Sequence, residues 1–285
     1  MKFSNLILRI LAVFVAVSIL QILAGALVAL LLPPKTGMPN LAQHFVQWMF
    51  LTNAVTVAAL SVLALRTEWR GWTLGAAVAA IPLVIALVNA LEGVYFLPNL
   101  PIEWPRIMAQ IALAAVLSVP VWMLLFGRRA ATPAEHFHPI AAKSRGERAW
   151  KFAVSDVAYL VLYFVAGTII WPYIKDFYAT QTLPSTSTIF VLELLLRGPV
   201  FVVLCLLMVR MLGLPRLSGA LAVGAIFTLV SGVAPLLMPN PYFPDAVRWA
   251  HFCEVSSSNF VFGAIVGWLW GQPKLEHPLV VHQAA

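Results

Sequence analysis

The sequence predicts an all-α membrane protein, a polytopic bundle of about eight transmembrane helices with both ends of the chain on the cytoplasmic side. Of its 285 residues, 61% are hydrophobic and 10% are charged, and the mean hydropathy is +0.90. Soluble domains are about a quarter charged. Several apolar stretches run for roughly 20 residues or more, enough for a helix to cross about 30 Å of hydrocarbon. The alternating strands of an outer-membrane barrel are absent from the sequence.

Proline and tryptophan mark the ends of the apolar stretches, and aromatic residues are common at membrane interfaces. Pro33 and Pro34, for example, follow the first stretch. That stretch comes after Lys2 and Arg9 and is longer than a signal-peptide core, so we expect an uncleaved anchor. The expected spans are residues 6–32, 45–65, 72–97, 107–126, 152–174, 187–211, 219–238 and 248–270.

The distribution of basic residues sets the expected orientation, because cytoplasmic loops are enriched in Lys and Arg. Of the 18 Lys and Arg residues, thirteen fall on the side of the N-terminus, four on the other side, and Arg197 lies within a span. We therefore expect a single domain, 1–285, in the inner (plasma) membrane with both termini inside. Its parts are a four-span half (1–126), a basic cytoplasmic loop (127–151), a second four-span half (152–270) and a cytoplasmic tail (271–285).

The net charge of +7 does not indicate nucleic-acid binding, because insertion topology already explains basic residues in short loops. Membrane lipids are the expected partners, and no nucleic acid is expected. The sequence has no phosphate loop or haem-attachment motif, so no cofactor is predicted. Cys205 and Cys253 both lie in apolar segments and give no information about a disulfide framework.

Polar side chains within the expected spans are the main functional signal, since an ionisable group in lipid costs several kcal/mol unless it is paired. Glu193 and Arg197 are four residues apart and can pair on one helix face. His251 and Glu254 are three apart and also share a face. The charged groups fall at a similar depth on different spans, which predicts one polar cavity in the outer half of the membrane. The alternative is that they only hold helices together. The candidates are Glu92, Glu193, Arg197, Ser231, His251, Glu254 and Asn259.

Three segments of the second half carry a resemblance to a known family. Residues 192–198 read Leu-Glu-Leu-Leu-Leu-Arg-Gly, Phe227 follows about thirty residues later, and Asn259 comes after that. The pattern resembles the CPBP intramembrane protease family, which includes the CAAX prenyl proteases and bacteriocin-processing relatives, over roughly residues 150–270. That family has two adjacent glutamates, three residues and an arginine, then Phe-x-x-x-His, then His-x-x-x-Asn. The resemblance implies an all-helical bundle of about eight spans.

The sequence departs from the family pattern at the positions that the family uses for catalysis. Leu192 stands in place of the first glutamate, which activates water in the family. Ser231 stands in place of the first histidine, and Val255 in place of the second. Hydrolysis by a neutral water needs a general base, and leucine cannot serve as one. The resemblance therefore implies a scaffold that has lost the protease chemistry.

Three functions fit these observations, and the sequence favours the first, which is not enzymatic. The cavity would bind a hydrophobic peptide, a lipid or a small solute. The second is an active intramembrane hydrolase, glutamate-based or metal-dependent. The third is a proton-coupled transporter in which Glu92 or Glu254 titrates. No metal site is assigned, because the spacing lacks a known motif such as H-E-x-x-H. The expected catalytic residues are Glu193, Arg197, His251 and Glu254, and the expected substrate-binding residues are Glu92, Ser231 and Asn259.

Overall fold

The computed structural model describes residues 3–33, 44–127, 140, 144–239 and 242–273. Of the described residues, 86% are helical and none lies in a strand. Within these described ranges, eight helices are long and apolar enough to cross a membrane. The predicted fold class, an all-α bundle with eight spans, is confirmed, and the chain is a multi-pass membrane protein.

Each expected span corresponds to one continuous helical segment. The first five are α1 (Phe3–Leu31), α2 (Phe45–Arg66), α3 (Gly71–Phe96), α4 (Trp104–Phe126) and α5 (Arg145–Tyr178). The sixth comprises α6 (Thr186–Leu192), η1 (Glu193–Arg197) and α7 (Gly198–Leu212). The seventh comprises α8 (Arg216–Thr228), η2 (Leu229–Val233) and α9 (Ala234–Leu237), and the eighth is α10 (Asp245–Trp270).

The largest difference from the expected spans is at the start of α5. The last part of the predicted loop 127–151 is helical from Arg145 onward. Ser144 caps this helix, because its hydroxyl oxygen accepts a hydrogen bond of 3.1 Å from the backbone N–H of Glu147. Most of the rest of that loop, and the tail from residue 274, lie outside the described residues.

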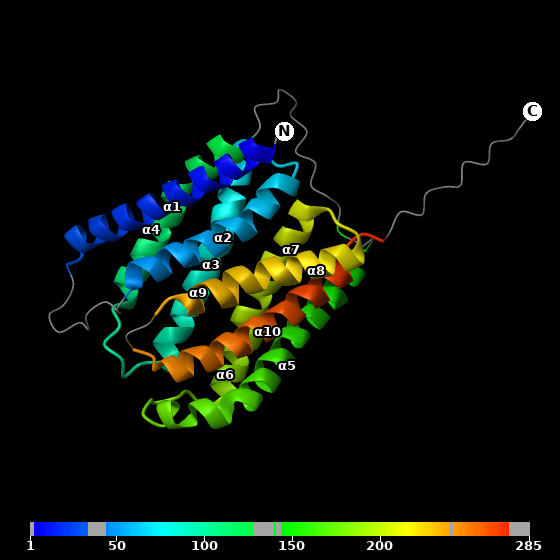
Figure 1. Cartoon of the computed structure of the whole chain (residues 1–285). Helices are drawn as coiled ribbons and strands as arrows, with labels where there is room; N and C mark the ends of the chain where they lie inside the picture. Colours follow the sequence, from blue (N-terminus) through cyan, green and yellow to red (C-terminus); the bar gives the residue numbers. More distant parts are fainter. Residues whose placement is uncertain (1–2, 34–43, 128–139, 141–143, 240–241, 274–285) are drawn as a thin grey trace, which may run out of the picture.

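The helices form one elongated bundle, with α1 and α4 along one edge and α5 and α6 along the opposite edge (Figure 1). The first turn of α1 and the last turn of α10 lie at the same end of the bundle, as an even number of spans requires. Which side of the membrane this end faces remains a prediction from the basic residues.

The two four-span halves share one hydrophobic core. Leu60 of α2 and Ile81 of α3 are fully buried in the same cluster as Phe201, Phe227 and Phe262 of the second half. The ring centroids of Phe201 and Phe227 are 5.1 Å apart, and those of Phe227 and Phe262 are 5.6 Å apart. A single core over both halves agrees with one membrane domain.

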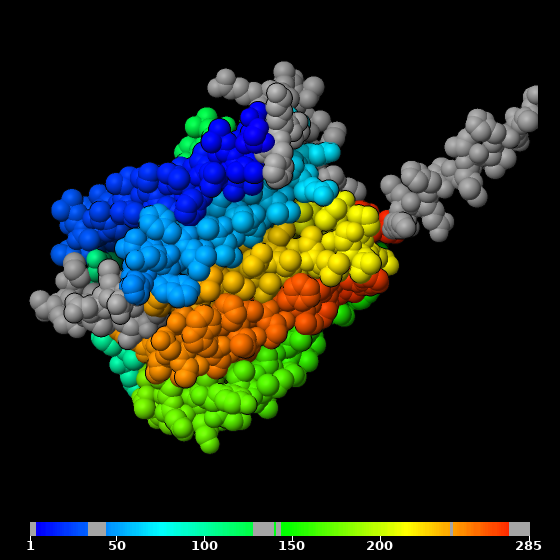
Figure 2. Space-filling view, in the orientation of Figure 1, coloured from blue at the N-terminus to red at the C-terminus, as the bar shows by residue number. Residues whose placement is uncertain are grey.

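The outer surface of the bundle carries many large apolar side chains. Figure 2 shows α1, α2, the α8–α9 helix, α10 and α5 as neighbouring stripes on one face. The α1 helix is the least buried of the eight spans, and its Leu8 and Leu30 are 67% and 79% exposed. Lipid tails are as apolar as leucine, so these side chains fit a surface that faces lipid.

Glycines allow α8 and α10 to pack closely. A Cβ atom on Gly263 would lie 2.9 Å from the Cα of Gly224, and one on Gly267 would lie 2.6 Å from the backbone oxygen of Gly219. Small residues at such a contact let two membrane helices approach each other. This packing fixes the position of α10 and therefore of the polar residues in its first half.

Candidate functional site

Two spans change from α-helical to π-helical winding where they carry polar residues. These segments are η1 and η2. Each ends two residues before a proline, Pro199 or Pro235. In a regular α-helix, a proline ring clashes with the carbonyl group four residues earlier, and the wider π turn gives it room. Such turns are frequent at functional sites, so η1 and η2 mark the candidate functional site in this bundle.

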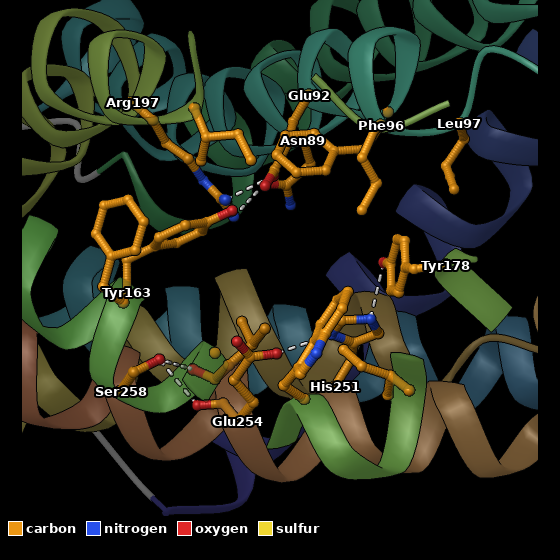
Figure 3. A pocket seen from close by; sticks show the side chains of 18 of the residues that line it. Asn89, Glu92, Phe96, Leu97, Tyr163, Tyr178, Arg197, His251, Glu254 and Ser258 are labelled. Carbon is orange, nitrogen blue, oxygen red and sulfur yellow. Dashed lines mark hydrogen bonds and ion pairs between the residues drawn. The ribbon is translucent and has the colours of Figure 1, made fainter. Parts of the chain in front are cut away.

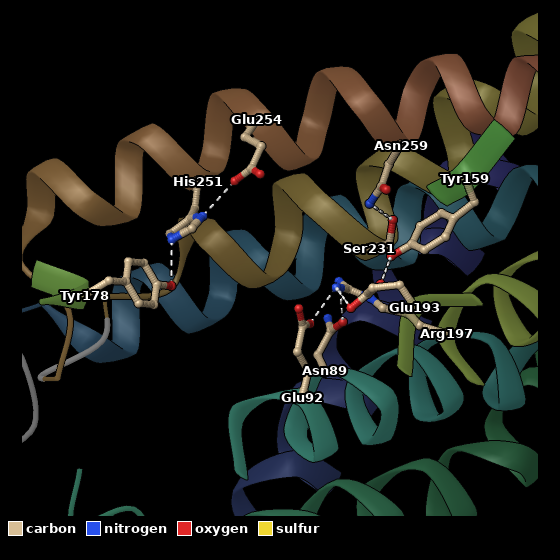
Figure 4. Close-up of polar contacts among 10 residues, drawn as sticks. All are labelled: Asn89, Glu92, Tyr159, Tyr178, Glu193, Arg197, Ser231, His251, Glu254 and Asn259. Carbon is tan, nitrogen blue, oxygen red and sulfur yellow. Dashed lines mark hydrogen bonds and ion pairs between the residues drawn. The ribbon is translucent and has the colours of Figure 1, made fainter. Parts of the chain in front are cut away.

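Arg197, the last residue of η1, is the centre of the first polar cluster (Figure 4). Its Nη1 atom lies 2.5 Å from Oε2 of Glu92 and 3.8 Å from Oε1 of Glu193. Its Nη2 atom donates a hydrogen bond of 3.2 Å to Oδ1 of Asn89. The guanidinium also lies 5.2 Å from the centre of the Phe201 ring. One cation therefore holds two carboxylates and an amide from α3 and η1.

Glu193 is almost fully buried, with 2% of its surface exposed. The Tyr159 hydroxyl donates a hydrogen bond of 3.0 Å to its Oε2 atom. The next turn must begin with a glycine: a Cβ atom on Gly198 would meet the carboxylate of Asp156 and lie 2.9 Å from the backbone oxygen of Glu193. Glu193 is therefore enclosed by the bundle and contacts Tyr159 and Arg197.

Ser231 and Asn259 join η2 to α10. The side-chain amide of Asn259 donates a hydrogen bond of 2.8 Å to Oγ of Ser231, whose hydroxyl donates to the backbone oxygen of Phe227 at 2.6 Å. Both side chains are buried. Ser231 and Asn259, which correspond to positions in two separate motifs of the family pattern, are thus in direct contact.

His251 and Glu254 form the second polar cluster, on α10. The Nδ1 atom of His251 lies 2.8 Å from Oε2 of Glu254, and its Nε2 atom lies 3.0 Å from the Tyr178 hydroxyl. An ionised carboxylate only accepts hydrogen bonds, so Nδ1 carries the proton that faces Glu254. In the neutral imidazole, Nε2 then accepts a hydrogen bond from Tyr178.

Both clusters face one cavity of about 720 Å³. Figure 3 shows Arg197, Glu92 and Asn89 on one side of it and His251 and Glu254 on the opposite side. The remaining wall is mainly aromatic and aliphatic. Its aromatic residues come from α3, α4, α5 and the segment before α10: Phe96, Trp104, Tyr159, Tyr163, Phe164, Trp171, Tyr178 and Phe243.

The structure brings together most of the side chains that the sequence singled out. Those that line the cavity are Glu92, Arg197, Ser231, His251, Glu254 and Asn259. Glu193, which was predicted to be catalytic, is not among the lining residues, because Tyr159 and the backbone of η1 enclose it. The catalytic and substrate-binding roles of all seven residues remain predictions.

Sequence reasoning missed the tyrosines of α5. Tyr159, Tyr163, Gly167 and Trp171 follow one another at intervals of four and all line the cavity. Residues at this spacing lie on one face of a helix. The signal in the sequence that could have identified this aromatic part of the wall is a row of aromatic residues at intervals of four, interrupted by one glycine.

Glu92, Glu193, His251 and Glu254, the acidic and histidine side chains of the two polar clusters, do not form one donor set for a metal ion. Glu92 and Glu193 contact Arg197 on one side of the cavity. His251 and Glu254 contact each other on the opposite side. Within the described ranges, no group of three or more His, Cys, Asp or Glu side chains is arranged to hold a metal ion. The geometry thus gives no support to the metal-dependent form of the hydrolase.

Comparisons of the chain with protein-family models, with curated proteins and with solved structures found no match. The resemblance to the CPBP family therefore remains an expectation from the motif residues.

Proposed function

We propose that this protein, in the inner (plasma) membrane, binds an amphipathic ligand in its cavity and does not cleave it. The ligand class includes lipids, hydrophobic peptides and small solutes with an apolar part. The scaffold would be a CPBP-like bundle whose catalytic groups have been replaced.

The cavity is the observation that carries this proposal. Its volume of about 720 Å³ lies within the range of ligand pockets, about 300–1,000 Å³. Its wall is mainly apolar, with a few charged groups on opposite sides. Side chains that only join helices would be expected to fill the space between them. Here Glu92 and Glu254 instead keep 24% and 12% of their side-chain surface exposed toward an open volume.

Two observations favour binding over hydrolysis. First, Leu192, Ser231 and Val255 occupy the positions where the family has its water-activating glutamate and its two histidines. Second, both ring nitrogens of His251 already have partners, Glu254 and Tyr178. A water molecule could use this imidazole as a base only after displacing Tyr178. The contact between Ser231 and Asn259 supports the kinship of the scaffold without restoring its chemistry.

A cavity-filling substitution tests the proposal. Gly167 lines the cavity, and a Cβ atom there would make only an ordinary contact of 3.6 Å with Oε1 of Glu254. Gly167→Trp should therefore fold and occupy part of the cavity. The matched control is Gly146→Trp, in the first turn of the same helix, where a Cβ atom has no heavy atom nearer than 4.0 Å.

The measurement is the melting temperature of the protein in nanodiscs of uncharged galactolipid, titrated with octyl amphiphiles that carry glucoside, sulfate or trimethylammonium heads. A ligand that binds only the folded state raises the melting temperature. At least one amphiphile should give a saturable increase for the wild type and Gly146→Trp that Gly167→Trp loses. Gly167→Leu replaces Gly167→Trp if the larger side chain prevents folding. Absence of any saturable increase, or its retention in the folded filled variant, would refute the binding function.

An active hydrolase is the second candidate, favoured by the Tyr178–His251–Glu254 chain of hydrogen bonds. Its test is cleavage of a quenched fluorogenic transmembrane peptide by the wild type and by His251→Gln. Turnover that His251→Gln abolishes, with the melting temperature unchanged, would establish the hydrolase and overturn the binding-only proposal.

A further inference from the structure

The carboxylates of the two polar clusters outnumber their basic groups. Arg197 contacts two carboxylates, those of Glu92 and Glu193, so this cluster has one more negative than positive charge when all three are ionised. On the opposite side, the ion pair that the described residues show for Glu254 is with His251, and this pair is neutral when the imidazole is protonated and negative when it is not. When all three carboxylates are ionised, the side chains at this site sum to at least one negative charge, in a region where lipid surrounds the bundle.

Arg197 does not offer an anion site. Its Nη1 atom faces Glu92 and Glu193, its Nη2 atom is bonded to Asn89, and its Nε atom is fully buried. Only 11% of its side-chain surface is exposed. An anionic ligand would have to displace a carboxylate that is already in contact with the guanidinium, and it would meet the remaining carboxylates.

Glu254 is the carboxylate best placed to receive a cation. Its Oε2 atom is bonded to His251, whereas its Oε1 atom lies over Gly167, where the absence of a side chain leaves it open to the cavity. Glu92, on the opposite side, is the other partly exposed carboxylate, and its Oε2 atom is held by Arg197. A positive group between the two sides would approach both carboxylates (Figure 3).

Aromatic rings surround the Glu254 side of the cavity. The Trp171 and Tyr178 rings stack with their centroids 6.4 Å apart, and Phe243 lies 6.3 Å from the imidazole of His251. Tyr163 also lines the cavity, with its ring centre 5.9 Å from the guanidinium of Arg197. Aromatic faces attract organic ammonium groups, and such rings together with carboxylates form the usual environment of bound quaternary ammonium.

We propose that the ligand of this cavity is an amphiphile with a positively charged ammonium head, held at Glu254 and the surrounding aromatic rings, and with an apolar tail. This inference rests on the proposed binding function and specifies its ligand class. Because the cavity also has an aliphatic wall that includes Leu162, Ile174 and Ile189, the tail has apolar surface to contact.

The test compares dissociation constants in the same uncharged nanodiscs for octyltrimethylammonium, octyl glucoside, octyl sulfate and tetramethylammonium. Octyltrimethylammonium should bind at least about tenfold more tightly than the other three. Glu254→Gln should weaken its binding about tenfold, and Glu254→Asp, which keeps the charge, should weaken it less. The control is Glu68→Gln. Glu68 is an exposed carboxylate between α2 and α3, outside the cavity, so this substitution should leave the dissociation constant of octyltrimethylammonium unchanged.

The failures are distinguishable. If octyl glucoside or octyl sulfate binds as tightly as octyltrimethylammonium, the ammonium inference is wrong while the binding function stands. Equal affinity for tetramethylammonium would show that the site binds a small cation, and would refute the proposal that the ligand is an amphiphile. If no probe binds in a way that Gly167→Trp removes, the binding function itself is wrong. A Glu254→Gln variant that keeps its melting temperature and full affinity would also refute the assignment.

Discussion

Replacing Arg197 by glutamine is the most direct perturbation of the first polar cluster. The substitution leaves Glu92 and Glu193 without their common cation. Removing one member of a buried ion pair costs about 3–5 kcal/mol, mainly because the other charge remains buried. Glu193 is 2% exposed and cannot recover water, whereas Glu92 keeps 24% of its side chain exposed to the cavity. We therefore expect the lower end of the range, about 3 kcal/mol of unfolding free energy.

A double-mutant cycle separates this ionic contact from other effects of the substitution. Glu92 lies closer to the guanidinium than Glu193 does, 2.5 Å against 3.8 Å. Adding Glu92→Gln to Arg197→Gln should thus restore about 1–3 kcal/mol relative to additivity. The assay is reversible unfolding in mixed micelles followed by circular dichroism. Arg9→Gln, at an exposed position of α1, is the control and should stay within about 0.5 kcal/mol of the wild type. A loss below about 1 kcal/mol, or strict additivity, would show that the pairing argument is wrong.

Three further substitutions test the framework around the site. Tyr159→Phe removes the only O–H donor to the buried Glu193 carboxylate that the described residues show, and should cost about 1–3 kcal/mol in the same unfolding assay; an unchanged stability would contradict this role. In Gly263→Val, the new Cβ atom would lie 2.9 Å from the Cα atom of Gly224, so α8 and α10 must separate and the melting temperature should fall by several degrees. Gly146→Val is the control. Ser144→Ala removes the cap of α5 and should cost about 1 kcal/mol, with Ser144→Asp retaining stability.

The spans could be predicted because lipid imposes a simple requirement on length and composition. The boundary of α5 could not, since Arg148 and Lys151 were counted as loop charges. In the structure Lys151 is in the helix, paired with Glu147 at 2.7 Å and packed 6.0 Å from the Trp270 ring. A long basic side chain can lie along an apolar surface while its charge is satisfied, and hydropathy alone does not detect this.

The pairs within the site differ in how predictable they were. The spacing of His251 and Glu254 correctly predicts a contact, because α10 is a regular helix there. The spacing of Glu193 and Arg197 predicts their pairing, but the shorter contact of the arginine is with Glu92 of α3. The residues between them wind as a π turn, which alters the i,i+4 geometry. Contacts between distant helices, such as this one, are not contained in local spacing.

The two π turns also have a consequence for chain length inside the membrane. A π turn accommodates one more residue than the α-helical turn it replaces. Deleting a single residue from η1 would let the segment return to α-helical winding at nearly the same length. The residues on either side of the deletion would keep nearly their present orientation, because the α turn covers the same rotation with one residue fewer. Relatives that have discarded the polar cluster can therefore be recognised by a one-residue gap in the middle of a span, where gaps are otherwise expected only in loops.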